Sequence, residues 1–124
     1  MRLGIDVGST TVKLILLDDD NKIIYQKYER HMSSVFDKVK EVLENLIDAV
    51  GDIEVKCVIT GSGGLALAEK IKTKFEQEVV TCSLAVKNLI PQTDVAIELG
   101  GEDAKITFFG STVEQRMNGT CAGG

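Results

Sequence analysis

The sequence lacks the features that mark several large classes of protein. Its 124 residues contain no run of 18 apolar residues, so we expect no transmembrane helix. The first residues carry no apolar region typical of a signal peptide. Basic residues are in the minority, with 14 Lys and Arg against 19 Asp and Glu, and the resulting net charge of −5 argues against nonspecific nucleic-acid binding.

Cysteine and histidine are also scarce. The three cysteines, Cys57, Cys82 and Cys121, are an odd number and form no CxxC pair. This pattern predicts reduced thiols in a cytoplasmic protein. Cys57 and Cys82 lie in apolar segments, where we expect them to act as small buried hydrophobes. The single histidine, His31, is expected in a surface loop.

No tandem repeat, low-complexity segment or proline-rich linker interrupts the chain, so we expect one domain over residues 1–124. Apolar residues make up 44% of it, enough for a hydrophobic core. The order of elements, three strands followed by alternating helices and strands, is typical of an α/β domain with a mixed sheet. Periodicity predicts strands at 3–7, 12–17, 22–28, 54–60, 78–81, 94–99, 105–109 and 113–117, and helices at 33–50, 65–75 and 82–90.

The helix over 33–50 has signals at both of its ends. Ser34 and Asp37 match a capping box, and Gly51 follows as a stop. The aspartates at 18–20 lack the alternating ligands, central glycine and distal glutamate of a calcium loop, so we expect a solvated hairpin turn there.

The most informative stretch is Asp6-Val7-Gly8-Ser9-Thr10-Thr11, between two apolar strands. It predicts a β-hairpin with Gly8 at the tip. Backbone N–H groups and hydroxyls around such a tip can hold phosphate. Asp6 at the strand end could hold Mg²⁺ directly or through water. The alternative is an ordinary Gly-Ser turn beside a solvated aspartate.

The same arrangement occurs a second time. The stretch Glu98-Leu99-Gly100-Gly101-Glu102-Asp103 again joins two strands through an acidic residue and a glycine turn. Two such hairpins facing each other would clamp a phosphate chain from both sides. Their acidic residues would then hold a metal ion and orient a water molecule.

A third glycine-rich turn, Gly61-Ser62-Gly63-Gly64, lies between a strand and a helix. A helix N-terminus suits phosphate, and the turn fits the permissive dinucleotide fingerprint GxGxxA. A dinucleotide-binding domain would use Glu78 as its acidic residue, but three strands precede the turn, where the fingerprint needs the first βα unit. The alternative is a tight connection that needs glycine for steric reasons.

Together, these motifs resemble the first and second phosphate loops of the actin, sugar-kinase and heat-shock-chaperone ATPase superfamily. The final residues, Arg-Met-Asn-Gly-Thr-Cys-Ala-Gly-Gly at 116–124, resemble the cysteine loop of a narrower family. That family comprises activators of 2-hydroxyacyl-CoA dehydratases and ATPase subunits of benzoyl-CoA reductase, the CoA-substrate-specific enzyme activases. The resemblance covers essentially the whole chain. It implies a ribonuclease-H-like, actin-like ATPase lobe with a mixed central sheet and helices on both faces.

The resemblance also implies a function. In that family a homodimer shares one four-iron, four-sulfur cluster, and ATP binding and hydrolysis push an electron to a partner dehydratase. By this resemblance Cys121 is a cluster ligand and Asp6 positions Mg²⁺, with thiolate as the ligand that such clusters need. The implied phosphate ligands are Gly8, Ser9, Thr10, Thr11, Gly100 and Gly101, and the residues implied near the metal or the attacking water are Glu102 and Asp103.

The sequence departs from the family pattern in two ways. Smaller activators carry Asp-Ile-Gly-Gly-Gln-Asp where this chain has Glu98 to Asp103, a version more like that of large multidomain activases. The family's adenosine-binding half and second cysteine ligand lie downstream and are absent. We therefore expect the N-terminal lobe of a longer protein, with the C-terminal lobe missing. This lobe should bind ATP weakly and hardly turn it over, with Cys121 as a free thiol.

Two further hypotheses share the same phosphate loops. One is the lobe of a small-molecule kinase that phosphorylates a sugar or an acid. The other is a regulatory lobe that uses nucleotide to switch an interface and is not an enzyme. Cys121 in its glycine loop favours the activator, because a kinase needs no thiol there. The brown colour of an iron–sulfur protein would separate the activator from both alternatives.

Overall fold

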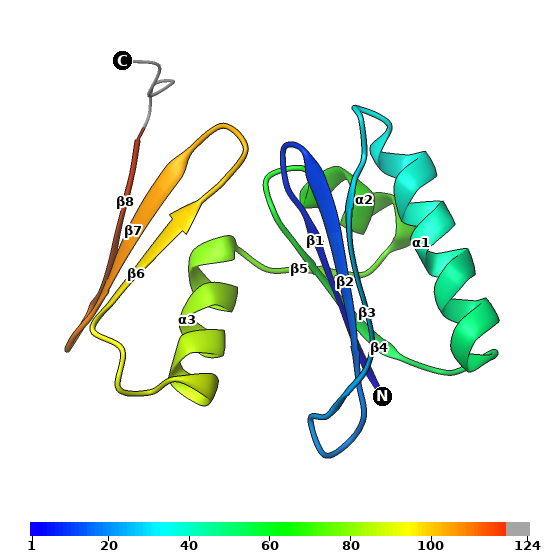
Figure 1. Cartoon of the computed structure of the whole chain (residues 1–124), viewed down its shortest axis with the longest axis horizontal. Coiled ribbons are helices and arrows are strands. Elements are labelled where there is room, and N and C mark those ends of the chain that lie inside the picture. Colours follow the sequence, from blue (N-terminus) through cyan, green and yellow to red (C-terminus); the bar gives the residue numbers. More distant parts are fainter. Residues whose placement is uncertain (119–124) are drawn as a thin grey trace. The chain divides into compact units, whose positions relative to one another are not determined.

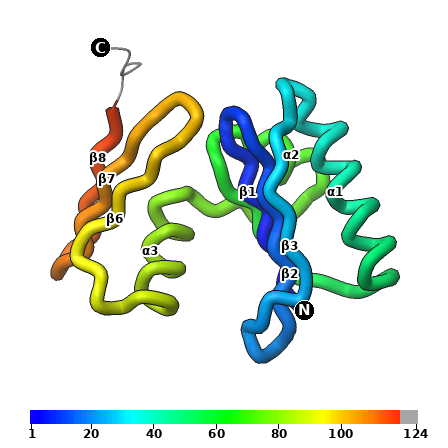
Figure 2. The backbone as a smooth tube through the Cα atoms, viewed as in Figure 1, coloured from blue at the N-terminus to red at the C-terminus, as the bar shows by residue number. Residues whose placement is uncertain are grey.

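The structure is a computed structural model that describes residues 1–118, and its contacts divide the chain into two compact units (Figures 1 and 2). The first unit is Met1–Glu76, and the second begins at Gln77. No linker composition in the sequence marks this division. The elements in chain order are β1 Arg2–Val7, β2 Thr11–Leu17, β3 Ile23–Arg30, α1 Val35–Val50, β4 Lys56–Thr60, α2 Gly64–Ile71, β5 Lys74–Phe75, α3 Glu78–Leu89, β6 Val95–Leu99, β7 Ala104–Phe109 and β8 Val113–Met117.

The first unit is built on a five-stranded mixed sheet in the order β3-β2-β1-β4-β5. β1 pairs antiparallel with β2 and parallel with β4, which lies on its other side. The predicted hairpin is confirmed, with Val7 opposite Val12 at its end. The predicted α/β class is also confirmed, although two sheets stand in place of one central sheet.

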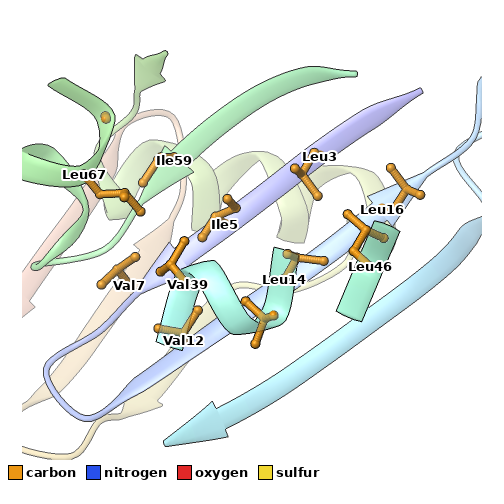
Figure 3. Close-up of a cluster of buried hydrophobic side chains, with 12 residues drawn as sticks. Leu3, Ile5, Val7, Val12, Leu14, Leu16, Val39, Leu46, Ile59 and Leu67 are labelled. Atoms are coloured by element: carbon orange, nitrogen blue, oxygen red, sulfur yellow. The ribbon is translucent and has the colours of Figure 1, made fainter. Parts of the chain in front are cut away.

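The core of the first unit lies between one face of this sheet and helices α1 and α2 (Figure 3). Alternate residues of β1 and β2 point into it, as the period of a half-buried strand requires. Burying each such aliphatic side chain contributes about 1.5–3 kcal/mol, so this layer is the main source of stability. The fully packed members are Leu3, Ile5, Val7, Val12, Leu14, Leu16, Val39, Val42, Leu46, Ile59, Leu67 and Ala68.

Helix α1 ends as the sequence predicts but does not begin with the predicted cap. Ser34 stands at the N-cap, but its hydroxyl bonds Asp37 Oδ2 at 2.6 Å and no backbone N–H, so the predicted capping box does not form. Gly51 ends the helix as predicted, with a left-handed φ of +84° and its N–H donating to Ile47 O at 2.7 Å.

Two predicted boundaries are wrong. The helix predicted over 65–75 ends at Ile71, because Lys72 takes a left-handed φ of 54° and the chain turns into β5 beside β4. The strand predicted over 78–81 is instead the first turn of α3. β-branched residues favour a strand only where they can pack on a sheet. Here the segment is helical, and the Thr81 hydroxyl donates to Glu78 O within the helix.

The second unit contains α3 and a three-stranded antiparallel sheet in the order β6-β7-β8. All three strands were predicted. β6 pairs with β7 so that Glu98 lies opposite Lys105, and β7 pairs with β8 so that Ile106 lies opposite Arg116. Thr107, on the central strand, is fully buried.

Candidate functional site

The turn between β1 and β2 is closed by one backbone bond, from Gly8 N–H to Thr11 O at 2.9 Å. Ser9 and Thr10 form its exposed tip, while Gly8 and Thr11 are half-buried. The tip therefore brings two hydroxyl-bearing residues to the surface. Hydroxyl donors at such a turn are suited to an anion.

Asp6, at the end of β1, has two carboxylate oxygens in different environments. Oδ2 accepts a hydrogen bond from Lys13 Nζ at 3.0 Å, across the hairpin. Oδ1 is buried and has no hydrogen-bond partner among the described residues. A buried anionic oxygen without a partner is costly, which is the condition that a cation or an ordered water relieves. The residue fits a Mg²⁺ ligand, held directly or through water.

The turn between β4 and α2 packs against the end of β1, beside Asp6. Gly61 has a left-handed φ of +97°, and a Cβ there would lie 2.5 Å from Asp6 Oδ1 and would also overlap Val7 O. Gly63 donates its N–H to Val7 O at 2.9 Å, and Gly64 donates to Gly61 O at 2.9 Å. Two N–H groups of this turn are thus already bonded within the protein, and the close approach of Gly61 to β1 supports the steric explanation for the glycine there.

His31 is not the surface residue that the sequence suggested. It directly follows β3, only 6% of it is exposed, and its Nε2 lies 3.1 Å from Gly8 O. Its backbone N–H also donates to Thr10 O at 3.1 Å. The missed signal was topological: the end of β3 must lie beside the start of β2, and therefore beside the glycine turn.

The turn between β6 and β7 repeats the first hairpin within the second unit. In both hairpins the glycine lies two residues after the strand acid, and a lysine lies seven residues after it. Gly100 N–H donates to Asp103 O at 2.8 Å, as Gly8 does to Thr11 O. The acid and the lysine are again cross-strand partners. The predicted recurrence of the hairpin is therefore present in the backbone geometry as well as in the sequence.

Glu98 is the counterpart of Asp6, and its Oε2 is likewise buried without a hydrogen-bond partner in the described part of the chain. In this hairpin the cross-strand lysine pairs with two other acids. Lys105 Nζ lies 2.8 Å from Glu78 Oε2 and 3.7 Å from Asp103 Oδ2. Burial lowers the pKa of Lys105, but Glu78, Asp103 and Glu98 together outweigh it, and the pKa stays above its ordinary value. Lys105 is therefore a fixed positive charge between three acids.

The remaining predicted residues of this turn differ in their environment. Gly101 and Glu102 are exposed, and Asp103 is half-buried. The Asp103 side chain packs against Gly100, because a Cβ added to Gly100 would lie 2.5 Å from Asp103 Oδ1. The two hairpins belong to different units, so the predicted clamp between them stays a prediction. Gly100, Gly101, Glu102 and Asp103 are available for the roles that the resemblance implies.

The cysteines are separated in the chain and in their environments. Cys57 and Cys82 are free thiols of intermediate exposure. Burial raises the pKa of both, and the negative charge of Glu98 raises that of Cys82 further. Cys121 lies outside the described residues. Among residues 1–118 no group of three or more His, Cys, Asp or Glu side chains is arranged to hold a metal ion.

The fold and the hairpins define an α/β lobe of the actin-like ATPase class. Residues 3–124 match the BadF/BadG/BcrA/BcrD ATPase family, and the chain belongs to that family. No helix in the described part of the chain is long and apolar enough to cross a membrane.

Two relatives of the chain are dehydratase activators. The (R)-2-hydroxyglutaryl-CoA dehydratase activating ATPase of Acidaminococcus fermentans is 32% identical over 98% of this chain and 48% of its own length. The 2-hydroxyisocaproyl-CoA dehydratase activator of Clostridioides difficile is 30% identical over 98% of this chain and 47% of its own. This chain thus spans about half the length of these relatives.

Solved structures agree with the sequence matches. The Clostridium difficile activator of 2-hydroxyisocaproyl-CoA dehydratase with bound ADPNP superposes with a TM-score of 0.76 at 25% identity, over 94% of this chain and 45% of that one. Component A of the Acidaminococcus fermentans (R)-2-hydroxyglutaryl-CoA dehydratase gives 0.77 at 28% identity, over 98% of this chain and 48% of that one.

Proposed function

We propose that this chain is the N-terminal, nucleotide-binding lobe of an ATP-dependent iron–sulfur activator. The activator would deliver electrons to a 2-hydroxyacyl-CoA dehydratase or a related CoA-ester reductase. Family membership and the two named activators support this proposal. One solved relative was obtained with bound ADPNP, which supports nucleotide as the ligand.

The observation that carries the nucleotide part is the orphaned oxygen of Asp6 beside a glycine turn. Asp6 would hold Mg²⁺ through Oδ1, while Lys13 keeps Oδ2 occupied and so fixes the orientation of the carboxylate. The bound metal would neutralise phosphate charge. Ser9 and Thr10 would donate their N–H and hydroxyl groups to phosphate oxygens.

The second hairpin would serve the same nucleotide. Gly100 and Gly101 would approach phosphate through their backbone, with Glu102 and Asp103 near the metal or the attacking water. Lys105 Nζ lies 3.7 Å from Asp103 Oδ2, and the lack of a side chain at Gly100 leaves room for the Asp103 carboxylate. Full catalysis would need the downstream lobe of a longer polypeptide, so this chain alone should bind ATP weakly and turn it over very slowly.

Cys121 carries the electron-transfer part of the proposal. It would be one thiolate ligand of a four-iron cluster that two subunits of the longer protein share. Reduced thiols and a cytoplasmic location suit such an air-sensitive centre. A single thiolate holds such a cluster poorly, so we expect Cys121 of the 124-residue chain to stay free.

Anaerobic iron and sulfide analysis of the longer protein tests this part. We expect about four irons per dimer, lost in Cys121→Ala and retained in the matched control Cys57→Ala. Cys57 is a suitable control because it packs beside the core of the first unit. Absence of iron after cluster reconstitution would contradict the activator assignment and favour a phosphotransferase of the same superfamily.

A further inference from the structure

His31 is bonded to the glycine turn through both its side chain and its backbone. Its side chain reaches Gly8 O through Nε2 at 3.1 Å, and its backbone N–H reaches Thr10 O at the same distance. Two of the carbonyls of the Gly8–Thr11 turn therefore bond to one residue. The residue is also buried, with only 6% of it exposed.

The second ring nitrogen is occupied as well. Ser33 N–H donates to Nδ1 at 3.1 Å. An N–H can only donate and a carbonyl can only accept, so Nδ1 must be bare and Nε2 must carry the proton. The two contacts together are satisfied only by the neutral imidazole protonated at Nε2.

The backbone around His31 is strained in a way that supports this arrangement. Met32 and Ser33 have positive φ values of 47° and 66°, and neither is glycine. Two consecutive left-handed residues are costly and persist only where surrounding contacts demand them. Here they wrap the chain around the ring, which brings Ser33 N–H to Nδ1, and Ser34 N–H then bonds His31 O at 2.7 Å.

We propose that His31 is a positioning residue of the phosphate-binding turn, an inference that rests on the proposed nucleotide function. The C=O of Gly8 and the N–H of Ser9 belong to one planar trans peptide and point in opposite directions. Holding Gly8 O on the His31 side therefore aims Ser9 N–H away from His31. The turn is preorganised for a ligand before the ligand arrives, which lowers the cost of binding.

Two substitutions at this position separate the two ring contacts. In His31→Gln the side-chain amide N–H can take the place of Nε2–H and donate to Gly8 O. In His31→Asn the shorter amide oxygen can replace Nδ1 as acceptor for Ser33 N–H, but no donor reaches Gly8 O. We expect His31→Asn to weaken Mg²⁺·ADPNP binding by about tenfold, and His31→Gln to remain within about threefold of the wild type.

A core variant controls for general loss of stability. Val42→Ala removes a fully buried side chain of α1 and should lower stability without changing the affinity for ADPNP. Equal affinities for the Asn and Gln variants would overturn the positioning role. An affinity loss in Val42→Ala as large as that in His31→Asn would also overturn it.

One measurement is independent of nucleotide binding. His31 is the only histidine, so a long-range ¹⁵N–¹H spectrum of the free chain reports its ring without assignment ambiguity. We expect a neutral ring with protonated Nε2 and bare Nδ1. A ring protonated at Nδ1, or an averaged pair of tautomers, would refute the proposed geometry. Absence of ADPNP binding by the wild type, with the expected tautomer present, would instead count against the nucleotide function alone and leave the His31 contact standing.

Discussion

At the scale of single residues, Gly61 faces the strictest steric demand in the described chain. Its φ of +97° alone disfavours a side chain, and Asp6 Oδ1 and Val7 O already fill the space that a Cβ would take. Gly51 has a similar φ of +84° but open space around it. Substitutions at these two glycines therefore separate the cost of a positive φ from the cost of steric overlap.

We predict that Gly51→Ala lowers the free energy of unfolding by about 1 kcal/mol, the cost of a positive φ. Gly61→Ala should cost about 3 kcal/mol or more, because overlap with the end of β1 adds to that strain. Urea denaturation of both variants measures the difference. Equal losses would mean that the close approach of the β4–α2 turn to β1 is wrong.

At the scale of elements, α3 is tied to its sheet by the ion pair between Glu78 and Lys105. Lys105→Met should cost about 2 kcal/mol, because it leaves the carboxylates of Glu78 and Asp103 without their cation. Lys40→Met, at an exposed surface pair, should change stability by less than about 0.5 kcal/mol.

The stability difference between wild type and Lys105→Met should depend on pH in a defined direction. The pKa of Lys105 is raised in the folded chain, so its contribution is complete below the ordinary value of 10.5 and is lost as pH rises through the folded pKa. The stability gap between wild type and Lys105→Met should thus be constant from neutral pH to about 9 and shrink above about 10.5. A gap that widens at alkaline pH would contradict the assigned pair.

β6 provides the other prediction at this scale. Its residues Val95, Ile97 and Leu99 are 43%, 67% and 83% exposed, whereas Leu3, Ile5 and Val7, at the matching places of β1, are 6%, 1% and 0% exposed. An edge strand with an exposed apolar face promotes association. We expect the chain to bind a hydrophobic dye and to self-associate with concentration. The double variant Ile97→Lys, Leu99→Glu should reduce both effects, and Leu65→Lys in α2 should not.

At the scale of the whole molecule, the sequence was most informative where local periodicity and topology agree. The strands that form hairpins were predicted because alternation and a glycine turn both indicate them. The short β5 and the helical 78–81 segment were missed because only a neighbouring strand or the turn before α3 decides them. His31 was missed for a similar reason, since its partner Gly8 lies 23 positions away in sequence.

The candidate site follows the same division. The two turns could be predicted from the sequence, because in both an acidic residue and then a glycine follow an apolar strand, and the same arrangement occurs twice. Which carboxylate oxygen is left without a partner depends on the lysine opposite and on the packing of Gly61, so only the three-dimensional structure could identify it.

The most direct measurement is the titration of ADPNP into the 124-residue chain, with Mg²⁺ and with a chelator, for wild type, Asp6→Asn and the control Asp18→Asn. Asp18 serves as control because its carboxylate accepts backbone N–H groups in the distant β2–β3 turn. We predict that Mg²⁺ strengthens binding to the wild type and to Asp18→Asn and has no effect on Asp6→Asn. Equal strengthening by Mg²⁺ in all three proteins, or no binding of ADPNP to the wild type, would contradict a nucleotide site built on Asp6.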